Sequence, residues 1–131
     1  MSRFRRSIIG STENEKIVYS MDSWSVTGAT SNQNIVSLSN FSGYKSGKNY
    51  RLTFDYDITT VNDGTNTIRV INTGAFGASG IIVDASSSGN HKGSASYDIT
   101  AKADGGMILR LSISASTVTA TIKNLMVAVI S

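Results

Sequence analysis

Two carboxylates at alternate positions are the residues that come closest to a catalytic pair. Asp55 and Asp57 are separated by one residue, so in an extended strand both point to the same face, about 7 Å apart. Paired acids at a short separation are what glycoside hydrolysis requires. A catalytic acid also needs a pocket and a raised pKa, whereas these two share an open outward face with Arg51. We therefore interpret them as solvated surface residues.

Other catalytic and metal-binding chemistry finds few side chains. The chain has no cysteine and a single histidine, His91, which argues against thiolate metal centres, histidine-centred metal sites and His-dependent triads. Asp84, Asp98 and Asp104 could place oxygens around calcium, but no calcium-binding motif contains them. His91 lies in a Gly-Asn-His-Lys-Gly segment that we interpret as an exposed turn. The expectation is a protein that is not an enzyme and has no cofactor, with calcium unsupported by any motif.

Aromatic residues offer a different chemistry, the stacking of a ring on a sugar. An aromatic face buries the apolar C–H face of a pyranose at little entropic cost. Trp24 and Tyr44 are the candidate glycan contacts, with Tyr19 and Tyr97 as further stacking residues. Trp24 belongs to an early candidate strand, where packing in the core is the alternative. Tyr44 lies in a Ser-Gly-Tyr-Lys-Ser-Gly loop, which favours exposure.

Residues 1–10, MSRFRRSIIG, form a basic and then apolar segment. Its arginines could make bidentate contacts with the carboxylates of a host protein, and its apolar side chains could fill pockets as anchors. The alternatives are a disordered tail or packing on the chain's own domain, because the apolar run is too short for a signal peptide. The candidate partner-anchoring residues are Arg3, Phe4, Arg5, Arg6, Ile8 and Ile9.

Charge is concentrated in this arm. The chain has 12 Lys and Arg against 9 Asp and Glu, and three of the basic residues lie between positions 3 and 6, so the rest balances at 9 against 9. A nucleic-acid interface would need basic residues clustered on a folded face, so no nucleic-acid partner is expected. No apolar run approaches the roughly 20 residues that span a bilayer, so no membrane partner is expected either.

Residues 11–131 are predicted to form one all-β domain that positions these side chains. In Tyr50–Ile58 every even position is apolar and every odd one polar, the period of a half-buried strand. Met107–Ile113 and Val118–Lys123 show similar alternation. After Lys123-Asn124 the apolar residues change from even to odd positions, which predicts a β-bulge or a strand that switches sheets. Weaker strand candidates are 16–20, 23–27, 34–39, 66–72, 80–84 and 94–100.

About eight or nine short strands between turn signals favour a β-sandwich or a barrel. We predict an antiparallel β-sandwich of the jelly-roll type, preceded by a short extended arm of residues 1–10. An immunoglobulin-like sandwich is less favoured because the chain has no Cys–Trp–Cys core.

The body resembles jelly-roll carbohydrate-binding modules of the family 4/9 type. The resemblance spans roughly residues 17–130 and rests on a pattern of strands: an early tryptophan strand, a Gly-Lys-x-Tyr-x-Leu-x-Phe-x-Tyr strand and a closing pair of apolar strands. It implies a jelly-roll fold and a glycan ligand. The matching segments are Asp22–Val26, Ser46–Tyr56, Ser96–Thr100, Gly106–Ile113 and Ala120–Val129.

The opening residues resemble the leaders of virion-attached proteins of gut-bacterial tailed phages, including crAss-like phages. In those proteins a short basic and apolar leader precedes a lectin-like or jelly-roll body. The resemblance implies that residues 1–10 dock to a capsid or other virion protein and that the body is displayed.

Two functional hypotheses follow. The first is a non-enzymatic virion structural protein, a head-fibre, capsid-decoration or tail-associated subunit assembled in the host cytoplasm. The second is a free-standing carbohydrate-binding module or lectin-like glycan binder. Residues 125–130 are apolar at nearly every position, as in a strand covered on both faces. A neighbouring copy could supply that cover, so a homo-oligomer is expected, a trimer by analogy with phage fibres.

Overall fold

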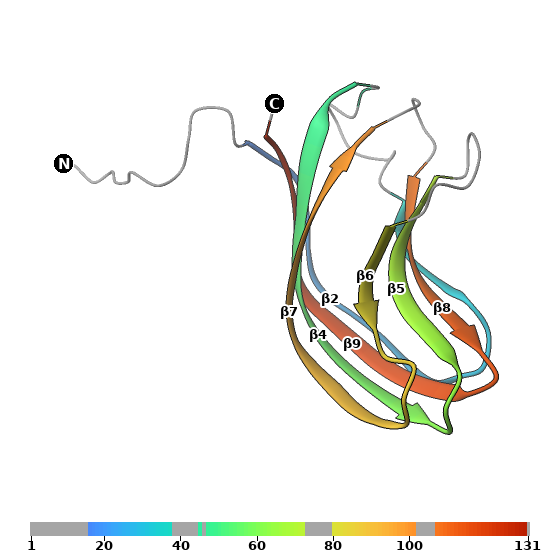
Figure 1. Cartoon of the computed structure of the whole chain (residues 1–131). Coiled ribbons are helices and arrows are strands. Elements are labelled where there is room, and N and C mark those ends of the chain that lie inside the picture. The colour runs from blue at the N-terminus through green and yellow to red at the C-terminus, as the bar shows by residue number, and fades with distance from the viewer. Residues whose placement is uncertain (1–15, 38–44, 46, 73–79, 102–106, 131) are drawn as a thin grey trace.

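The computed structural model describes residues 16–37, 45, 47–72, 80–101 and 107–130. These residues form two four-stranded antiparallel sheets that pack face to face (Figure 1). No helix in this part of the chain has the length and apolar character needed to cross a membrane. The strands are β2 (Lys16–Ala29), β3 (Gln33–Ser37), β4 (Asn49–Val61), β5 (Thr65–Asn72), β6 (Gly80–Asp84), β7 (Gly89–Thr100), β8 (Met107–Ser114) and β9 (Thr117–Val129).

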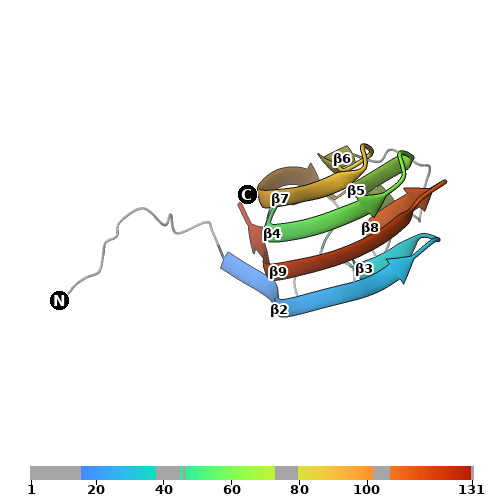
Figure 2. The ribbon, with the colours of Figure 1, turned by 90° about the horizontal axis from the view of Figure 1, so that it is seen from below.

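The strand order is that of a jelly roll. One sheet has the order β2-β9-β4-β7 and the other β3-β8-β5-β6, and Figure 2 shows the two layers one behind the other. Apart from the β5–β6 hairpin, each connection between consecutive strands crosses from one sheet to the other, which is the winding of a double Greek key. The β2-β9-β4-β7 sheet has the longer strands and is the larger of the two. It bends at its lower end toward the β3-β8-β5-β6 sheet (Figure 1). The prediction of an antiparallel jelly-roll sandwich is therefore confirmed.

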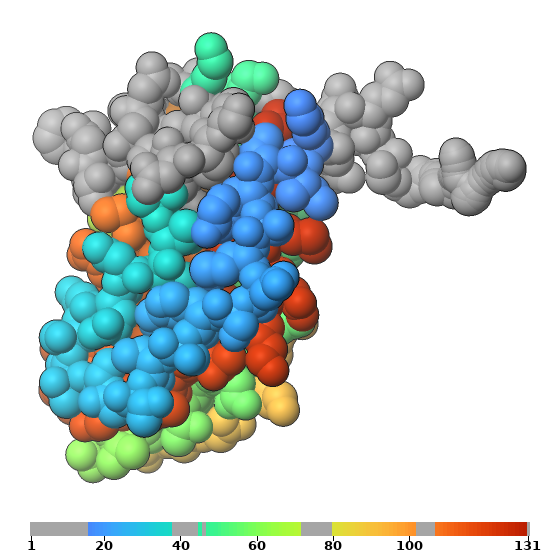
Figure 3. All heavy atoms as spheres, turned by 180° about the vertical axis from the view of Figure 1, so that it is seen from behind, coloured from blue at the N-terminus to red at the C-terminus, as the bar shows by residue number. Residues whose placement is uncertain are grey.

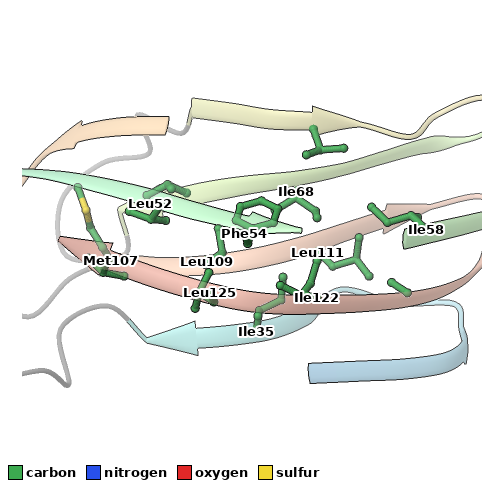
Figure 4. Packing of buried hydrophobic residues seen from close by; sticks show 14 of the residues in the cluster. Ile35, Leu52, Phe54, Ile58, Ile68, Met107, Leu109, Leu111, Ile122 and Leu125 are labelled. Carbon is green, nitrogen blue, oxygen red and sulfur yellow. The ribbon is translucent and has the colours of Figure 1, made fainter. Parts of the chain in front are cut away.

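The core lies between the sheets and is built from the apolar stripes that the alternation predicts. On β4, Tyr50, Leu52 and Ile58 are fully buried, as are Leu109 and Leu111 on β8. Side chains of both sheets interdigitate in this layer (Figure 4). Burying an aliphatic or aromatic side chain of this size stabilises the fold by about 1.5–3 kcal/mol. The core therefore provides the rigid support on which the outer faces stand.

The change of parity in the closing strand is a β-bulge. β9 stays in one sheet along its whole length, and its register against β4 shifts between the pairs Thr53↔Met126 and Asp55↔Lys123. Two residues of β9 therefore stand opposite one residue of β4. Asn124 lies in the bulge and has a φ of 56°. Asparagine tolerates this left-handed conformation better than most residues. As a result, the inward stripe resumes at Leu125, which is fully buried.

Some expected boundaries were wrong. The two segments 16–20 and 23–27 are one continuous strand, β2, and His91 lies in β7 rather than in a turn. His91 is half-buried, stands opposite Ile58, and its Nε2 lies 2.7 Å from the backbone oxygen of Ser87. The small residues of 89–96 hide the alternation, but pairing with the well-formed strand β4 extends β7 over them.

Substitution of Asn124 tests the bulge. A β-branched side chain is strained at positive φ, by roughly 1–2 kcal/mol. We expect Asn124→Val to lower the free energy of unfolding by about that amount, whereas Asn124→Gly, which accepts the same φ, stays within about 0.5 kcal/mol. Urea denaturation measures both. Equal losses for the two variants would show that the bulge does not depend on this backbone conformation.

Candidate functional site

The outer face of the β2-β9-β4-β7 sheet gathers the polar side chains that the alternation sends away from the core. The odd residues of β4 from Arg51 to Thr59 lie on this face, and their cross-strand partners on β7 are polar as well. The partners on β9 are polar opposite Asp55, Asp57 and Thr59, whereas Arg51 and Thr53 stand opposite Ala128 and Met126. Asp55 pairs with Ser94 and Lys123, and Asp57 with Lys92 and Thr121. The centre of the sheet thus carries two carboxylates between two lysines.

Asp55 accepts hydrogen bonds from side chains on both neighbouring strands, β7 and β9. The Ser94 hydroxyl donates to its Oδ1 at 2.6 Å, and the Asn124 amide donates to its Oδ2 at 2.9 Å. The hydrogen bonds from Ser94 and then Asn124 lower the pKa of Asp55 below 3.8, because they stabilise the ionised form. The bulge therefore has a second effect: it turns the Asn124 amide onto the carboxylate.

Two shallow depressions flank Asp55. One has a volume of about 200 Å³ and is lined by Asp55, Tyr56, Asp57, Lys92, Thr121 and Lys123. The second, of about 440 Å³, lies on the other side and is lined by Thr53, Phe54, Asp55, Ser94, Ala95, Ser96, Asn124 and Met126. Together they form an open surface across three strands, in which hydrogen-bonding side chains stand among apolar ones such as Tyr56 and Met126. We call the residues that line either of the two depressions the Asp55 surface.

Two other carboxylates of this sheet, Asp57 and Asp98, accept hydrogen bonds from a neighbouring strand. The Arg51 guanidinium contacts Asp98 at 2.8 Å through Nε and 3.2 Å through Nη2, and the hydrogen bond and charge of Arg51 lower the pKa of Asp98. Asn90 donates from Nδ2 to Asp57 Oδ1 at 2.7 Å and to Thr59 at 3.1 Å. These contacts tie β4 to the edge strand β7.

The arrangement is suited to binding rather than to acid catalysis. A general acid at neutral pH needs a raised pKa in a closed pocket, but the pKa of Asp55 is lowered and its surroundings are open. Among the described residues, no group of three or more His, Cys, Asp or Glu side chains could hold a metal ion. Asp84 and Asp98 lie on different sheets, in β6 and β7, and Asp104 lies outside the described residues.

The structure describes one of the two candidate glycan contacts. Trp24 lies on β2 opposite Ile122, half-buried and packed against the core. It faces inward, so it is not brought together with the Asp55 surface, and a glycan contact through it stays a prediction. Tyr44 and all six anchoring residues of the arm lie outside the described residues.

Two residues of this surface, Lys92 and Asn124, were not singled out from the sequence as candidate site residues. Sequence reasoning treated Lys92 as part of a turn and Asn124 only as the place where the parity changes. The signal for Lys92 is its cross-strand register with Asp57, which appears once β7 is extended to Gly89. The signal for Asn124 is the preference of asparagine for left-handed positions, which marks the residue at which a bulge places its side chain.

The lowered pKa of Asp55 can be measured directly. We expect its carboxyl to titrate below 3.8 in a carbon-detected NMR titration, and Ser94→Ala to move the midpoint upward toward 3.8 because the largest stabilising bond is lost. The hydrogen bonds to the ionised Asp55 stabilise the fold fully when the pH is above the pKa of this carboxyl in the unfolded chain. This contribution is lost as the pH falls through its lower pKa in the folded protein. Ser96→Ala, which lines the same depression without bonding to Asp55, is the control. A midpoint that Ser94→Ala leaves in place would contradict the assignment.

Comparison with known proteins gives no family. No family model matches the chain, and no curated protein matches it.

Proposed function

We propose that the chain is a non-enzymatic virion structural protein, a capsid-decoration, head-fibre or tail-associated subunit of a tailed phage. In this proposal residues 1–10 dock to a virion protein and the jelly roll is displayed. The observation that carries it is the separation of charge: three arginines crowd into residues 3–6, while the remaining basic and acidic residues balance at 9 and 9. Such a segment can form bidentate contacts with host carboxylates, and no other stretch of four residues in the sequence holds three basic residues.

The placement of β2 supports this division of labour. β2 begins at Lys16 and is an edge strand of its sheet, and in Figure 3 it runs along one side of the molecule. All the strands that the structure describes lie downstream of residue 15. The arm can therefore be removed without deleting any residue of the described sandwich.

Particle association tests the proposal. Mass spectrometry of purified phage particles is expected to find the chain in stoichiometric amounts. Recombinant protein lacking residues 2–10 is expected to keep its melting temperature and to lose binding to particles that lack the native chain. Arg3, Arg5 and Arg6 changed together to Gln should do the same. The matched control changes Lys45, Lys48 and Lys92 to Gln, which removes the same charge from the body. Equal binding by the arm and body variants would overturn the anchor.

Self-association belongs to the same proposal, since virion appendages repeat. Ile17 and Met126 are 57% and 40% exposed, and Ile17 stands opposite Ala128 on the outer face. This apolar patch at the β2–β9 edge supports a homo-oligomer, with a trimer as the expected order. Sedimentation velocity of the full chain and of Ile17→Thr tests it. A monomer at high micromolar concentration would contradict it.

The Asp55 surface favours a second candidate function, glycan binding. Its two depressions place carboxylate, amide, hydroxyl and ammonium groups side by side, the mixture that satisfies the hydroxyls of a sugar. The aromatic residues in its lining are Tyr56 and Phe54, and both belong to the inward-facing positions of β4. Hydrogen bonds rather than ring stacking would therefore provide the affinity. NMR titration with cellohexaose and with xylohexaose tests it. The double variant Lys92→Gln and Thr121→Val should abolish the chemical-shift changes that the oligosaccharide causes. The control variant Lys48→Gln should leave those changes in place.

A further inference from the structure

The outer face of the smaller sheet, β3-β8-β5-β6, contains a cross-strand pair of arginines. Arg69 on β5 stands directly opposite Arg110 on β8, at a distance at which side chains on one face of a sheet interact, with Cβ atoms about 4.5–5.5 Å apart. Both side chains are half-buried. We call these two residues the arginine pair.

No described carboxylate forms an ion pair with the arginine pair. Like charges directly opposite each other destabilise a sheet, so such a pair normally comes with a carboxylate. Within the described residues, neither arginine forms an ion pair; the ion pair found there joins Arg51 and Asp98 on the other sheet. Asp84, the described carboxylate of β6, accepts hydrogen bonds from the backbone and hydroxyl of Ser86.

Neutral side chains hold the two guanidinium groups in place. Arg69 donates from Nε to Thr67 Oγ1 at 3.2 Å, and Arg110 donates from Nε to Asn34 Oδ1 at 3.0 Å. Each bond uses the Nε–H, so the planar end of each guanidinium keeps its terminal N–H donors for another acceptor. Side chains fixed in this way lose less entropy on binding. The sheet thus presents preorganised donors for a planar anion.

Aliphatic side chains flank the arginine pair on one side. Arg69 stands opposite Ile81, which is 53% exposed, and Ile71 with Ile108 is one adjoining cross-strand pair on the same face. The opposite side is polar and neutral, with Asn34 opposite Arg110 and the pair Thr67 with Ser112 next along the strands. The described residues of this face include no aromatic side chain on which a sugar ring could stack. An acidic group flanked by aliphatic side chains fits this surface better than an acidic sugar does.

We propose that the arginine pair binds a carboxylate of a partner protein, presented by an extended acidic segment with aliphatic residues beside it. Two guanidinium groups can each form charge-assisted bonds to such a carboxylate, while the isoleucines bury the flanking side chains. This site is on the sheet opposite the Asp55 surface and does not involve residues 1–10. It is therefore independent of the arm and of glycan binding, and it can fail or hold separately from both.

The test uses the full chain and a fluorescein-labelled peptide, Leu-Gly-Glu-Gly-Glu-Gly-Leu, whose extended form places its charged and apolar side chains on one face. Fluorescence anisotropy at low salt is expected to show binding that weakens as salt rises. Arg69→Gln and Arg110→Gln should each weaken it about tenfold, the cost of one charge-assisted bond, and the double variant should abolish it. Arg51→Gln, which removes an arginine paired with a carboxylate on the other sheet, should leave it unchanged.

Three outcomes would overturn the proposal. The first is equal binding of the same peptide with Gln in place of Glu. The second is equal, arginine-dependent binding of inorganic phosphate or digalacturonate, which would make this a small-anion site. The third is a lower melting temperature for Arg69→Gln and Arg110→Gln, because relief of like-charge repulsion should leave the melting temperature unchanged or raise it. A fall would give the arginines a structural role instead.

Discussion

Asn66→Ala is expected to lower the free energy of unfolding by about 2–4 kcal/mol, because it breaks a buried polar network. Asn66 is fully buried. Its Oδ1 accepts a hydrogen bond from the Ser116 hydroxyl at 2.6 Å, and its Nδ2 reaches the backbone oxygen of Ala85 at 3.5 Å. Truncation leaves the Ser116 hydroxyl without this acceptor in the interior, where an unpaired polar group costs the full price of its desolvation.

The network has this weight because it joins two connections, the segment after β6 and the β8–β9 turn, to strands β4 and β5. The backbone N–H of Ala85 donates to the Asn66 carbonyl at 2.8 Å, and the Thr60 hydroxyl donates to the Ala85 carbonyl, also at 2.8 Å. The segment after β6 is thus held to β4 and β5, while Ser116 brings in the turn between β8 and β9. Loss of Asn66 therefore loosens contacts between both sheets.

Urea denaturation measures the effect, and Asn90→Ala is the matched control. Asn90 is an exposed asparagine on β7 that bonds to Asp57 and Thr59, all of which water can serve after truncation, so its loss is expected to stay below about 1 kcal/mol. A double-mutant cycle with Ser116→Ala should show coupling, since the hydroxyl has nothing to orphan once Asn66 is gone. Equal losses at Asn66 and Asn90, with no coupling, would contradict the role of the network.

The alternation of residues was enough to predict the fold class and the core. Tyr50–Ile58 contains its own evidence for a strand, because each inward position is apolar and each outward one polar. The inward positions are buried except Tyr56, which is half-buried. The irregularity at Lys123-Asn124 was also predictable, since a change of parity within one apolar run indicates a β-bulge or a strand that switches sheets, and the pairing of β9 with β4 shows the bulge. In both cases the information is local, and the physics that uses it is local.

The candidate sites could be predicted much less well, because they depend on register. Asp57 and Lys92, or Arg69 and Arg110, lie more than 30 residues apart in the chain and meet only when their strands pair. Nothing near Arg69 in sequence indicates that another arginine will stand opposite it. The same limit explains Asn66, whose burial contradicts its polarity and becomes understandable only when Ser116 is seen beside it.

The second large effect is expected at Gly64, in the connection between β4 and β5. A Cβ added there would overlap the backbone oxygen of Ser114 and lie 3.0 Å from the Ser116 hydroxyl. Backbone at the β8–β9 turn cannot move aside as the end of a flexible side chain can, so Gly64→Ala forces two connections apart. Gly64 also donates its N–H to the Ser86 carbonyl at 3.0 Å, a bond that such a shift would stretch.

We expect Gly64→Ala to cost about 3 kcal/mol of stability in urea denaturation, at the upper end for over-packing. Gly28→Ala is the control that separates close approach from backbone strain. Gly28 has φ of 63° and nothing within 4 Å of an added Cβ, so alanine there carries only the left-handed penalty of about 1 kcal/mol. Both substitutions reduce the entropy of the unfolded chain equally. A larger loss at Gly28 would mean that conformation, rather than contact between the turns, accounts for glycine at position 64.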